Sequence, residues 1–108
     1  MIRDATFGPV CLFGLGGIFT EILKDVGMMP APLDKTDADR LIRSIRTLPL
    51  LTGARGGAAC DLDSLADMIA KLSNLMDRYP EIREVDLNPV ICYPDGALVA
   101  DARMILGS

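Results

Sequence analysis

Apolar residues recur every three to four positions in two parts of the chain, a spacing that predicts amphipathic helices. The first helix is expected to begin at a cap formed by Asp34 or Thr36 and to end at Pro49, because proline cannot continue a helix. Acidic Asp37 and Asp39 suit its first turn. Its apolar face is expected to consist of Leu41, Ile42, Ile45 and Leu48.

A second helix is predicted over residues 62–79, with Asp61 as its amino-terminal cap and Pro80 after its end. One side of this helix is apolar and the other carries charged and amide side chains, so one face should lie on a core. The apolar stripe consists of Leu62, Leu65, Ile69, Leu72 and Met76.

Strands are predicted before the first helix. Residues 9–13 are apolar, residues 18–26 begin apolar and end charged, and the glycine-rich residues 14–17 lie between them. This pattern predicts an antiparallel hairpin. Residues 28–32 should stay extended, because proline keeps the residue before it out of the helical region.

A second hairpin is expected after the second helix, with strands over residues 84–92 and 97–106. Residues 93–96 read Tyr-Pro-Asp-Gly, a sequence typical of a tight turn, and Pro89 suits a strand edge or bulge. The expected order is strand, strand, helix, helix, strand, strand. The fold class is therefore α+β, with an antiparallel sheet of two hairpins and two helices in a single domain over residues 1–108.

Composition narrows the functional classes. The formal net charge is −4 and the cationic side chains are scattered, which argues against a nucleic-acid partner. The apolar run at residues 7–19 is shorter than the roughly 20 residues that span a bilayer, so no membrane segment is expected. Three cysteines without paired spacing indicate a reducing cytoplasm. Histidine is absent, so any phosphohistidine must lie outside this sequence.

Asn88 and Asp101 are the candidates for a metal site. A two-residue turn at residues 94–95 sets a register in which these two residues are cross-strand neighbours, with Cβ atoms roughly 4.5 to 5.5 Å apart. Mg²⁺ prefers oxygen ligands and usually takes only one or two from protein, so this pair suits it. A bulge after the turn would shift the register, and the alternative is a surface or turn-capping role for both residues.

Three further polar residues are candidates for chemistry. Asp86 shares a strand face with Asn88, because strand side chains alternate. Glu21 lies in an otherwise apolar predicted strand and is either a solvated carboxylate or one aimed at a cleft. Arg55 lies among glycines, where its guanidinium either binds a phosphate or remains a solvated loop group.

Several spaced segments together resemble the ATP-grasp domain of the NDP-forming acyl-CoA synthetases, of the acetyl-CoA synthetase type related to the succinyl-CoA synthetase beta subunit. The resemblance covers essentially the whole chain, and its segments follow one another in order. They are Phe7-Gly8-Pro9-Val10, Phe13-Gly14-Leu15-Gly16-Gly17-Ile18-Phe19, Glu21, Leu23-Lys24-Asp25-Val26, Ala31-Pro32-Leu33, Pro49-Leu50-Leu51, Gly53, Arg55-Gly56, Asp61-Leu62-Asp63, Glu84-Val85-Asp86-Leu87-Asn88-Pro89, Pro94-Asp95-Gly96 and Asp101-Ala102-Arg103.

The resemblance implies that the chain is the carboxyl-terminal lobe of an ATP-grasp domain whose amino-terminal lobe is absent. It further implies a site for Mg²⁺ and ATP or ADP, in which Asn88 and Asp101 hold the metal between nucleotide phosphates. Asp86 matches an acidic position that orients a phosphorylated histidine, and Glu21 matches an acidic position near the nucleotide, so both are expected to be catalytic. Arg55 is expected to bind the nucleotide cofactor.

The implied reaction is that of an ADP-forming acyl-CoA synthetase, an acid–thiol ligase. Acyl-CoA, phosphate and ADP are interconverted with a free acid, CoA and ATP through an acyl phosphate and a phosphohistidine. The chain is expected to be inactive alone, because its partners are the missing lobe and the CoA-binding, histidine-bearing domains or subunit. Two alternatives stay open: the ATP-grasp part of a protein acetyltransferase fusion, and a non-catalytic α+β module for dimerisation or regulation, which would form a homo-oligomer.

Overall fold

The computed structural model describes all residues except 7, 16–24, 54–58 and 108. The described residues form a five-stranded antiparallel sheet in the order β3-β2-β1-β4-β7 and a two-stranded antiparallel sheet of β5 and β6. The α+β fold class is confirmed. The strands are β1 (Ile2–Asp4), β2 (Gly8–Gly14), β3 (Val26–Pro30), β4 (Ile82–Leu87), β5 (Val90–Tyr93), β6 (Gly96–Val99) and β7 (Ala102–Leu106); the helices are α2 (Lys35–Arg43), α3 (Leu48–Leu51) and α4 (Leu62–Arg78).

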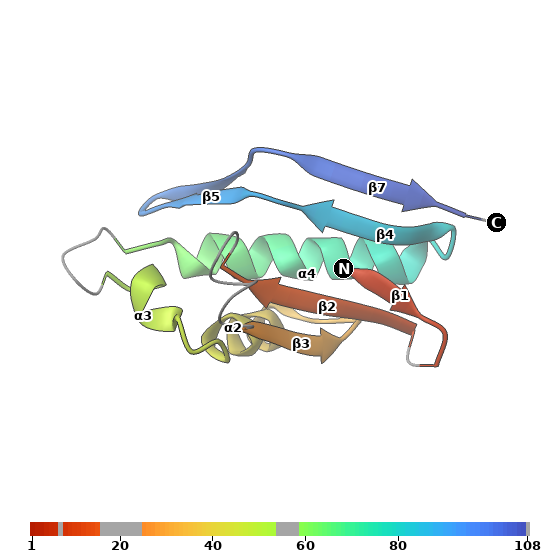
Figure 1. The fold of residues 1–108 in the computed structure, drawn as a ribbon, viewed down its shortest axis with the longest axis horizontal. Helices are drawn as coiled ribbons and strands as arrows, with labels where there is room; N and C mark the ends of the chain where they lie inside the picture. The colour runs from red at the N-terminus through yellow and green to blue at the C-terminus, as the bar shows by residue number, and fades with distance from the viewer. Residues whose placement is uncertain (7, 16–24, 54–58, 108) are drawn as a thin grey trace.

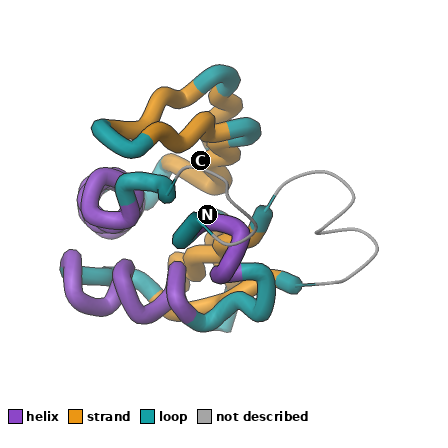
Figure 2. The backbone as a smooth tube through the Cα atoms, turned by 90° about the vertical axis from the view of Figure 1, so that its left-hand side faces the viewer, coloured by secondary structure: helices purple, strands orange, loops and turns teal. Residues whose placement is uncertain are grey.

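Helices α2 and α4 pack against each other and cover one face of the five-stranded sheet (Figures 1 and 2). Figure 2 shows the two helices next to one another on the left of the view, beside the strands. Two clusters of buried side chains hold these layers together, and Phe13 and Ile69 pack against both. The first cluster is Met1, Cys11, Leu33, Leu41, Met76, Ile82 and Val85. The second is Ala38, Ile42, Ile45, Leu51, Leu65 and Ala66.

Helix α4 confirms the prediction for residues 62–79 almost to the residue. Asp61 is its cap, because its carboxylate accepts a hydrogen bond from the Ser64 backbone N–H at 3.0 Å. The predicted apolar stripe faces the core: Leu65 and Met76 are buried, and the other members pack against the buried clusters. None of the described helices is both long and apolar enough to cross a membrane.

Helix α2 begins as predicted but ends earlier. Asp34 is its cap, with Asp37 completing a capping box. The prediction that Pro49 ends this helix is wrong, because the helix stops at Arg43. The Asp25 carboxylate accepts hydrogen bonds from the backbone N–H groups of Arg46 and Thr47, each at 2.7 Å, so these amides are not available to extend a helix.

Pro49 lies instead in the first turn of α3. A missing backbone N–H is tolerated at that position, because the first amides of a helix have no partner within the helix. The apolar residues that were assigned to one helix therefore come from two elements, with Ile42 on α2 and Leu48 on α3.

The first hairpin is formed by β2 and β3, in a register that runs from Val10 opposite Pro30 to Gly14 opposite Val26. The prediction of a partner strand over residues 18–26 is wrong at its described end, because Asp25 lies outside any strand and β3 begins at Val26. Residues 18–24 lie outside the described part of the chain. The segment predicted to be extended after residue 28 supplies most of the actual strand.

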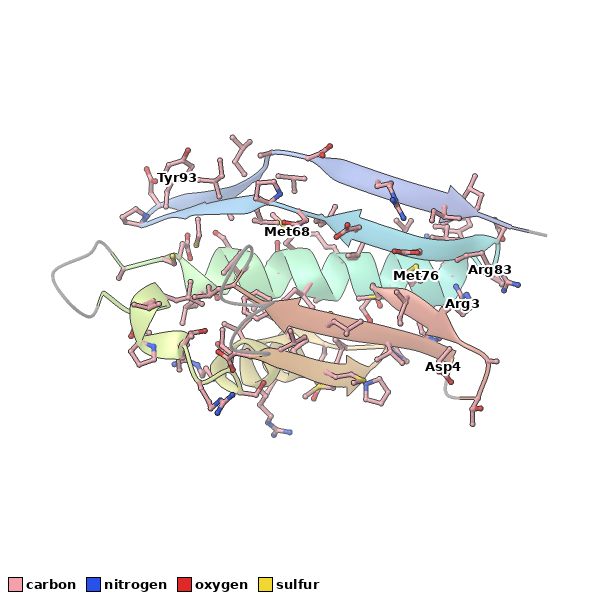
Figure 3. The ribbon with its side chains drawn as sticks, viewed as in Figure 1. Arg3, Asp4, Met68, Met76, Arg83 and Tyr93 are labelled. Atoms are coloured by element: carbon pink, nitrogen blue, oxygen red, sulfur yellow. The ribbon has the colours of Figure 1, made fainter. Side chains whose placement is uncertain are left out.

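Strand β1 was not predicted, because three residues are too few to show an alternating pattern. It lies between β2 and β4 and pairs with both. Arg3 anchors it, since the guanidinium donates to the carbonyl oxygen of Met76, near the carboxyl end of α4, at 2.7 Å and to that of Ile82, at the start of β4, at 3.1 Å (Figure 3).

The second hairpin has the predicted turn but each of its two long strands is divided. β4 and β7 pair within the large sheet, whereas β5 and β6 form the small one. The predicted continuous strands over residues 84–92 and 97–106 are therefore wrong in this respect. Pro89 lacks an N–H for a sheet ladder and lies at the first division, which is the position where proline is tolerated.

Candidate functional site

The two strand divisions of the second hairpin lie opposite each other. The backbone N–H of Asn88 donates to the carbonyl oxygen of Asp101 at 3.0 Å, and the N–H of Ala100 donates to the carbonyl oxygen of Pro89 at 3.0 Å. Leu87 lies opposite Ala102 on one side of this junction, and Val90 lies opposite Val99 on the other. The register is therefore unbroken from the turn into the large sheet, and Asn88 lies opposite Asp101 as the turn predicts.

Side chains of β4 alternate across this point. Val85 is buried in the core, while Asp86 and Asn88 are exposed on the opposite face of the strand. Cross-strand partners project on the same face, so the exposed Asp101 belongs to the same surface as Asn88. The amide oxygen of Asn88 and the carboxylate of Asp101 are thus presented together to solvent.

The surroundings of this pair are mainly acidic. Asp86 lies opposite Arg103 on β7, and the Arg103 guanidinium is 3.8 Å from the Glu84 carboxylate. An exposed ion pair at this distance contributes little to stability and leaves the guanidinium able to turn toward another anion. The face around Asn88 therefore carries three carboxylates, of Glu84, Asp86 and Asp101, and one guanidinium.

The ligand atoms at Asn88 and Asp101 are oxygens, which hard cations prefer. Within the described residues, no three His, Cys, Asp or Glu side chains lie close enough together to hold a metal ion. A structural zinc site normally needs four nitrogen or sulfur ligands, and none is formed at Asn88 and Asp101. Mg²⁺ accepts one or two protein oxygens and completes its shell with water and phosphate oxygens, so it fits an amide and a carboxylate.

Asp86 and Asn88 also border a cavity of about 390 Å³. Its other walls are mostly apolar and come from β2 and α4, including Leu12, Phe13 and Met68. Figure 3 shows Met68 between α4 and the strands of the second hairpin. The polar surface and this cavity therefore adjoin each other along β4.

Two predicted site residues, Glu21 and Arg55, lie outside the described residues. The roles expected for them remain predictions. The described part of the chain brings together Asp86, Asn88 and Asp101, which come from the two strands of one hairpin.

The sequence analysis missed a buried carboxylate. Asp25 is 6% exposed, and its oxygens accept hydrogen bonds from the Thr47 hydroxyl and from two backbone amides. The Thr47 hydroxyl bond, followed by these amides and the Arg46 charge, holds the pKa of Asp25 below its usual range despite the opposing effect of burial. The family resemblance includes Asp25, but no local pattern predicted its burial, because its partners lie more than twenty residues away.

Two cysteines also meet in the fold. The Cys60 thiol lies 3.9 Å from the backbone carbonyl oxygen of Cys92. The Cys92 thiol lies 3.9 Å from the backbone carbonyl oxygen of Asp61, the residue after Cys60. Burial, with the neighbouring Cys60 thiol, raises the pKa of Cys92 to about 12. All three cysteines are free thiols in this structure; Cys11 is buried, whereas Cys60 and Cys92 are only partly buried.

Comparison with known protein families assigns this architecture. The model of the ATP-grasp domain matches residues 1–106. This chain belongs to the ATP-grasp family. The family resemblance inferred from the spaced segments is therefore confirmed over nearly the whole sequence.

The relatives of this ATP-grasp chain are acyl-CoA ligases. It is 53% identical over 106 residues to the beta subunit of ADP-forming acetate–CoA ligase I of Pyrococcus furiosus, covering 98% of this chain and 46% of that subunit. It is 47% identical over 107 residues to the beta subunit of ADP-forming acetate–CoA ligase II of the same organism, covering 96% of this chain and 45% of that subunit. The chain thus spans less than half the length of these relatives.

A solved relative has the same fold. The dinucleotide-forming acetyl-coenzyme A synthetase 1 of Candidatus Korarchaeum cryptofilum superposes with a TM-score of 0.92 at 43% identity, over 98% of this chain and 50% of that one. That structure contains coenzyme A and Mg-AMPPCP, with its phosphohistidine segment pointing toward the nucleotide-binding site. The chain therefore spans about half the length of that solved polypeptide.

Proposed function

We propose that the face of the second hairpin around Asn88 and Asp101 binds Mg²⁺ and nucleotide phosphates, and that it is one half of a phosphoryl-transfer site in an ADP-forming acyl-CoA ligase. The observation that carries this proposal is the backbone hydrogen bond between Asn88 and Asp101, which sets their oxygen-bearing side chains side by side on an exposed strand face. The relatives that are acetate–CoA ligases support the assignment of the reaction.

Asn88 and Asp101 are the residues that would hold the metal. When bound, Mg²⁺ neutralises charge on the phosphate oxygens, which lowers the barrier to phosphoryl transfer. The protein's own contribution is positioning: the paired backbone fixes the points from which the two side chains project, so no backbone rearrangement is needed on binding. Of the two proposed ligands, only Asp101 carries a negative charge, because Asn88 is a neutral amide. The pair therefore repels the nucleotide phosphates less than two carboxylates would.

Asp86 is proposed to act on the phosphoryl-carrying histidine of the parent enzyme. Its exposed carboxylate lies two residues before Asn88 on the same face and can accept a hydrogen bond from an imidazole N–H, which would fix the ring for attack on a phosphate. The chain contains no histidine, so this imidazole must come from another part of the protein. Glu21 and Arg55 are proposed as further nucleotide-side residues on the basis of the family resemblance.

The rest of the parent protein is proposed to cover the face of the large sheet that lies opposite the helices. Ile2, Leu12, Val26 and Met28 are between 39% and 67% exposed, and their ladder positions place them on the sheet face opposite the helices. Apolar side chains gathered on one face indicate a surface that contacts another protein part. We infer that the amino-terminal ATP-grasp lobe lies there and closes the nucleotide site, while CoA-binding and histidine-bearing domains or a second subunit deliver the phosphoryl group.

Manganese binding to the isolated chain tests the metal site directly. Mn²⁺ replaces Mg²⁺ at oxygen sites and broadens the NMR signals of nearby amides. Broadening is expected at residues 86–89 and 100–102, to be lost in Asp101→Ala and to persist in the exchanged variant Asn88→Asp/Asp101→Asn. Asp95→Ala, which removes a carboxylate at the exposed turn of the same hairpin, is the matched control and should behave as the unchanged protein. Broadening that survives Asp101→Ala, or that centres on the turn, contradicts the proposed site.

Turnover of the longer protein tests the reaction. In a full-length protein that carries this sequence, Asn88→Ala and Asp101→Ala should each reduce phosphoryl transfer between nucleotide and histidine by about a hundredfold, the usual scale for losing a group that stabilises charge in the transition state. Unchanged turnover in both variants would remove the metal assignment, and a chain that forms dimers without responding to Mg²⁺ and ADP would favour the non-catalytic module.

A further inference from the structure

Cys60 and Cys92 bring two thiols together from segments that lie 32 positions apart in the sequence. Cys60 lies shortly before α4, and Cys92 lies on β5. The two thiols hydrogen-bond with each other, and the Cys60 thiol also lies 3.9 Å from the backbone carbonyl oxygen of Cys92. We call these two residues the thiol pair.

We propose that the thiol pair is a redox-sensitive modification site, in which Cys60 and Cys92 form an intramolecular disulfide by exchange with a low-molecular-weight disulfide such as oxidised glutathione. The disulfide tethers the small sheet to the amino-terminal end of α4. The inference does not rest on the nucleotide site proposed above, because it concerns only the thiols and the elements that carry them.

Hydrogen bonds hold the backbone on both sides of the thiol pair. The N–H of Asp61 donates to the carbonyl oxygen of Tyr93 at 2.8 Å, and each cysteine directly precedes one of these two residues. The N–H of Cys60 also donates to the carbonyl oxygen of Leu51 at 2.7 Å, and Cys92 is paired within the small sheet. Figure 1 shows β5 beside the amino-terminal end of α4. The disulfide therefore requires rotation of two side chains and no movement of a helix or strand.

The third cysteine lies elsewhere. Cys11 is buried in the first core cluster, whereas Cys60 and Cys92 are only partly buried and pack against the second. A small disulfide in solution can reach a partly buried thiol but not one enclosed in the core. Of the three possible pairings, the fold therefore selects the one between Cys60 and Cys92.

The exchange has two steps. In the first, the Cys60 thiol loses its proton to solvent and its sulfur attacks one sulfur of the small disulfide, whose S–S bond breaks as one small thiolate leaves. In the second, the Cys92 thiol loses its proton and its sulfur attacks the Cys60 sulfur, so that the second small thiolate leaves. The protein dithiol is oxidised by two electrons, and the small disulfide is reduced to two thiols that take up the two protons.

The surroundings of Cys92 favour the disulfide over the dithiol. Burial, with the neighbouring Cys60 thiol, raises the pKa of Cys92 to about 12, so the reduced pair gains no stabilisation as a thiolate. Strongly oxidising disulfides are those whose reduced form is stabilised, so the disulfide of this pair should resist reduction. The fixed backbone also gives Cys92 a high effective concentration at Cys60, which favours closure over a lasting adduct with the small thiol.

The disulfide would add a covalent bond where the structure has only non-covalent contacts. The inner face of the small sheet, formed by Val90, Cys92 and Ala97, packs against the second core cluster. The N–H of Asp61 adds one backbone hydrogen bond to β5. A bond between Cys60 and Cys92 closes a loop that contains α4 and β4, and closing a loop restricts the opened state more than the folded one. Separation of the small sheet from α4 should therefore become rarer.

Peptide mapping of a full-length protein that carries this sequence tests the site. The folded protein is incubated with oxidised glutathione, its remaining thiols are blocked, and it is digested with trypsin, which cleaves between Cys60 and Cys92 after Lys71 and Arg83. Mass spectrometry should find the two peptides joined by a disulfide, in at least about tenfold excess over glutathione attached to either cysteine. Dithiothreitol should separate them. The matched control Cys11→Ala should form the same link.

Removal of the second thiol tests the order of the two steps. In Cys92→Ala, glutathione should stay attached to Cys60, because no neighbouring thiol is present to displace it. A glutathione adduct that persists on Cys60 in the unchanged protein, while Cys92 stays free, would overturn the proposal. A link that forms only after urea has unfolded the protein would also overturn it, since the fold would then not bring the thiols together.

Hydrogen exchange tests the tether. In the unchanged protein, the amide of Asp61, which donates to β5, should exchange at least about tenfold more slowly after the disulfide has formed. The amide of Ala31, which donates to the carbonyl oxygen of Pro9 in a distant part of the fold, is the internal control and should exchange alike in both forms. Unchanged exchange at Asp61 in the disulfide form would overturn the tether, because the small sheet would then separate from α4 as before.

Discussion

Ser73 is a buried polar group whose removal tests how α4 holds the segment between β3 and α2. Its side chain is fully buried, and its hydroxyl oxygen accepts a hydrogen bond from the Leu33 backbone N–H at 2.6 Å, across 40 residues of sequence. Leu33 is itself 2% exposed. In Ser73→Ala this buried N–H loses its acceptor while water has no access to replace it.

The expected cost follows from this burial. An unsatisfied buried donor costs about 1 to 3 kcal/mol of unfolding free energy, and the smaller alanine side chain adds little strain. For a domain of 108 residues, the entropy of unfolding converts this loss into a fall of about 4 to 13 °C in the thermal midpoint. The slope of unfolding free energy against urea concentration should not change, because the surface exposed on unfolding is the same.

Thermal unfolding followed by circular dichroism, together with urea unfolding, measures both quantities. Asn74→Ala is the matched control, since Asn74 is the next residue of the same helix and is exposed, and its effect should stay within about 0.5 kcal/mol. A midpoint for Ser73→Ala that equals that of the control would refute the reasoning, because the Leu33 amide would then have another partner in solution.

Two further predictions concern titration. The folded-state pKa of Asp25 is lowered, so the stability that its carboxylate contributes is present above about pH 4, the ordinary aspartate range, and is lost as the pH falls below it. The free energy of unfolding in urea, measured between about pH 2.5 and 6, should therefore depend less on pH in Asp25→Asn. The same change at the exposed Asp77, Asp77→Asn, should leave the pH dependence as it is. A pKa of about 12 keeps the Cys92 thiol protonated at pH 7.5, so iodoacetamide should modify it at least about a hundredfold faster in urea than in the folded protein; equal rates would show that the thiolate is not suppressed.

Local pattern was sufficient for much of the fold and for the arrangement of the candidate site. The apolar stripe and the cap at Asp61 predicted α4, because both signals lie within one helix. The Tyr-Pro-Asp-Gly turn predicted that Asn88 and Asp101 are neighbours, since a tight turn transmits its register along both strands. The family resemblance likewise depended on segments that can be recognised in order along the chain.

Only the tertiary structure decided the features that depend on distant partners. The end of α2 is set by the Asp25 carboxylate, which accepts hydrogen bonds from amides twenty-one and twenty-two residues later. The local sequence around residues 44–49 still has a helical pattern, so this end could not be predicted from it. The division of the second hairpin into two sheets and the position of β1 between β2 and β4 both follow from how the elements pack. A sequence specifies which residues can pair nearby, whereas contacts between distant segments are selected by the free energy of burying one common core.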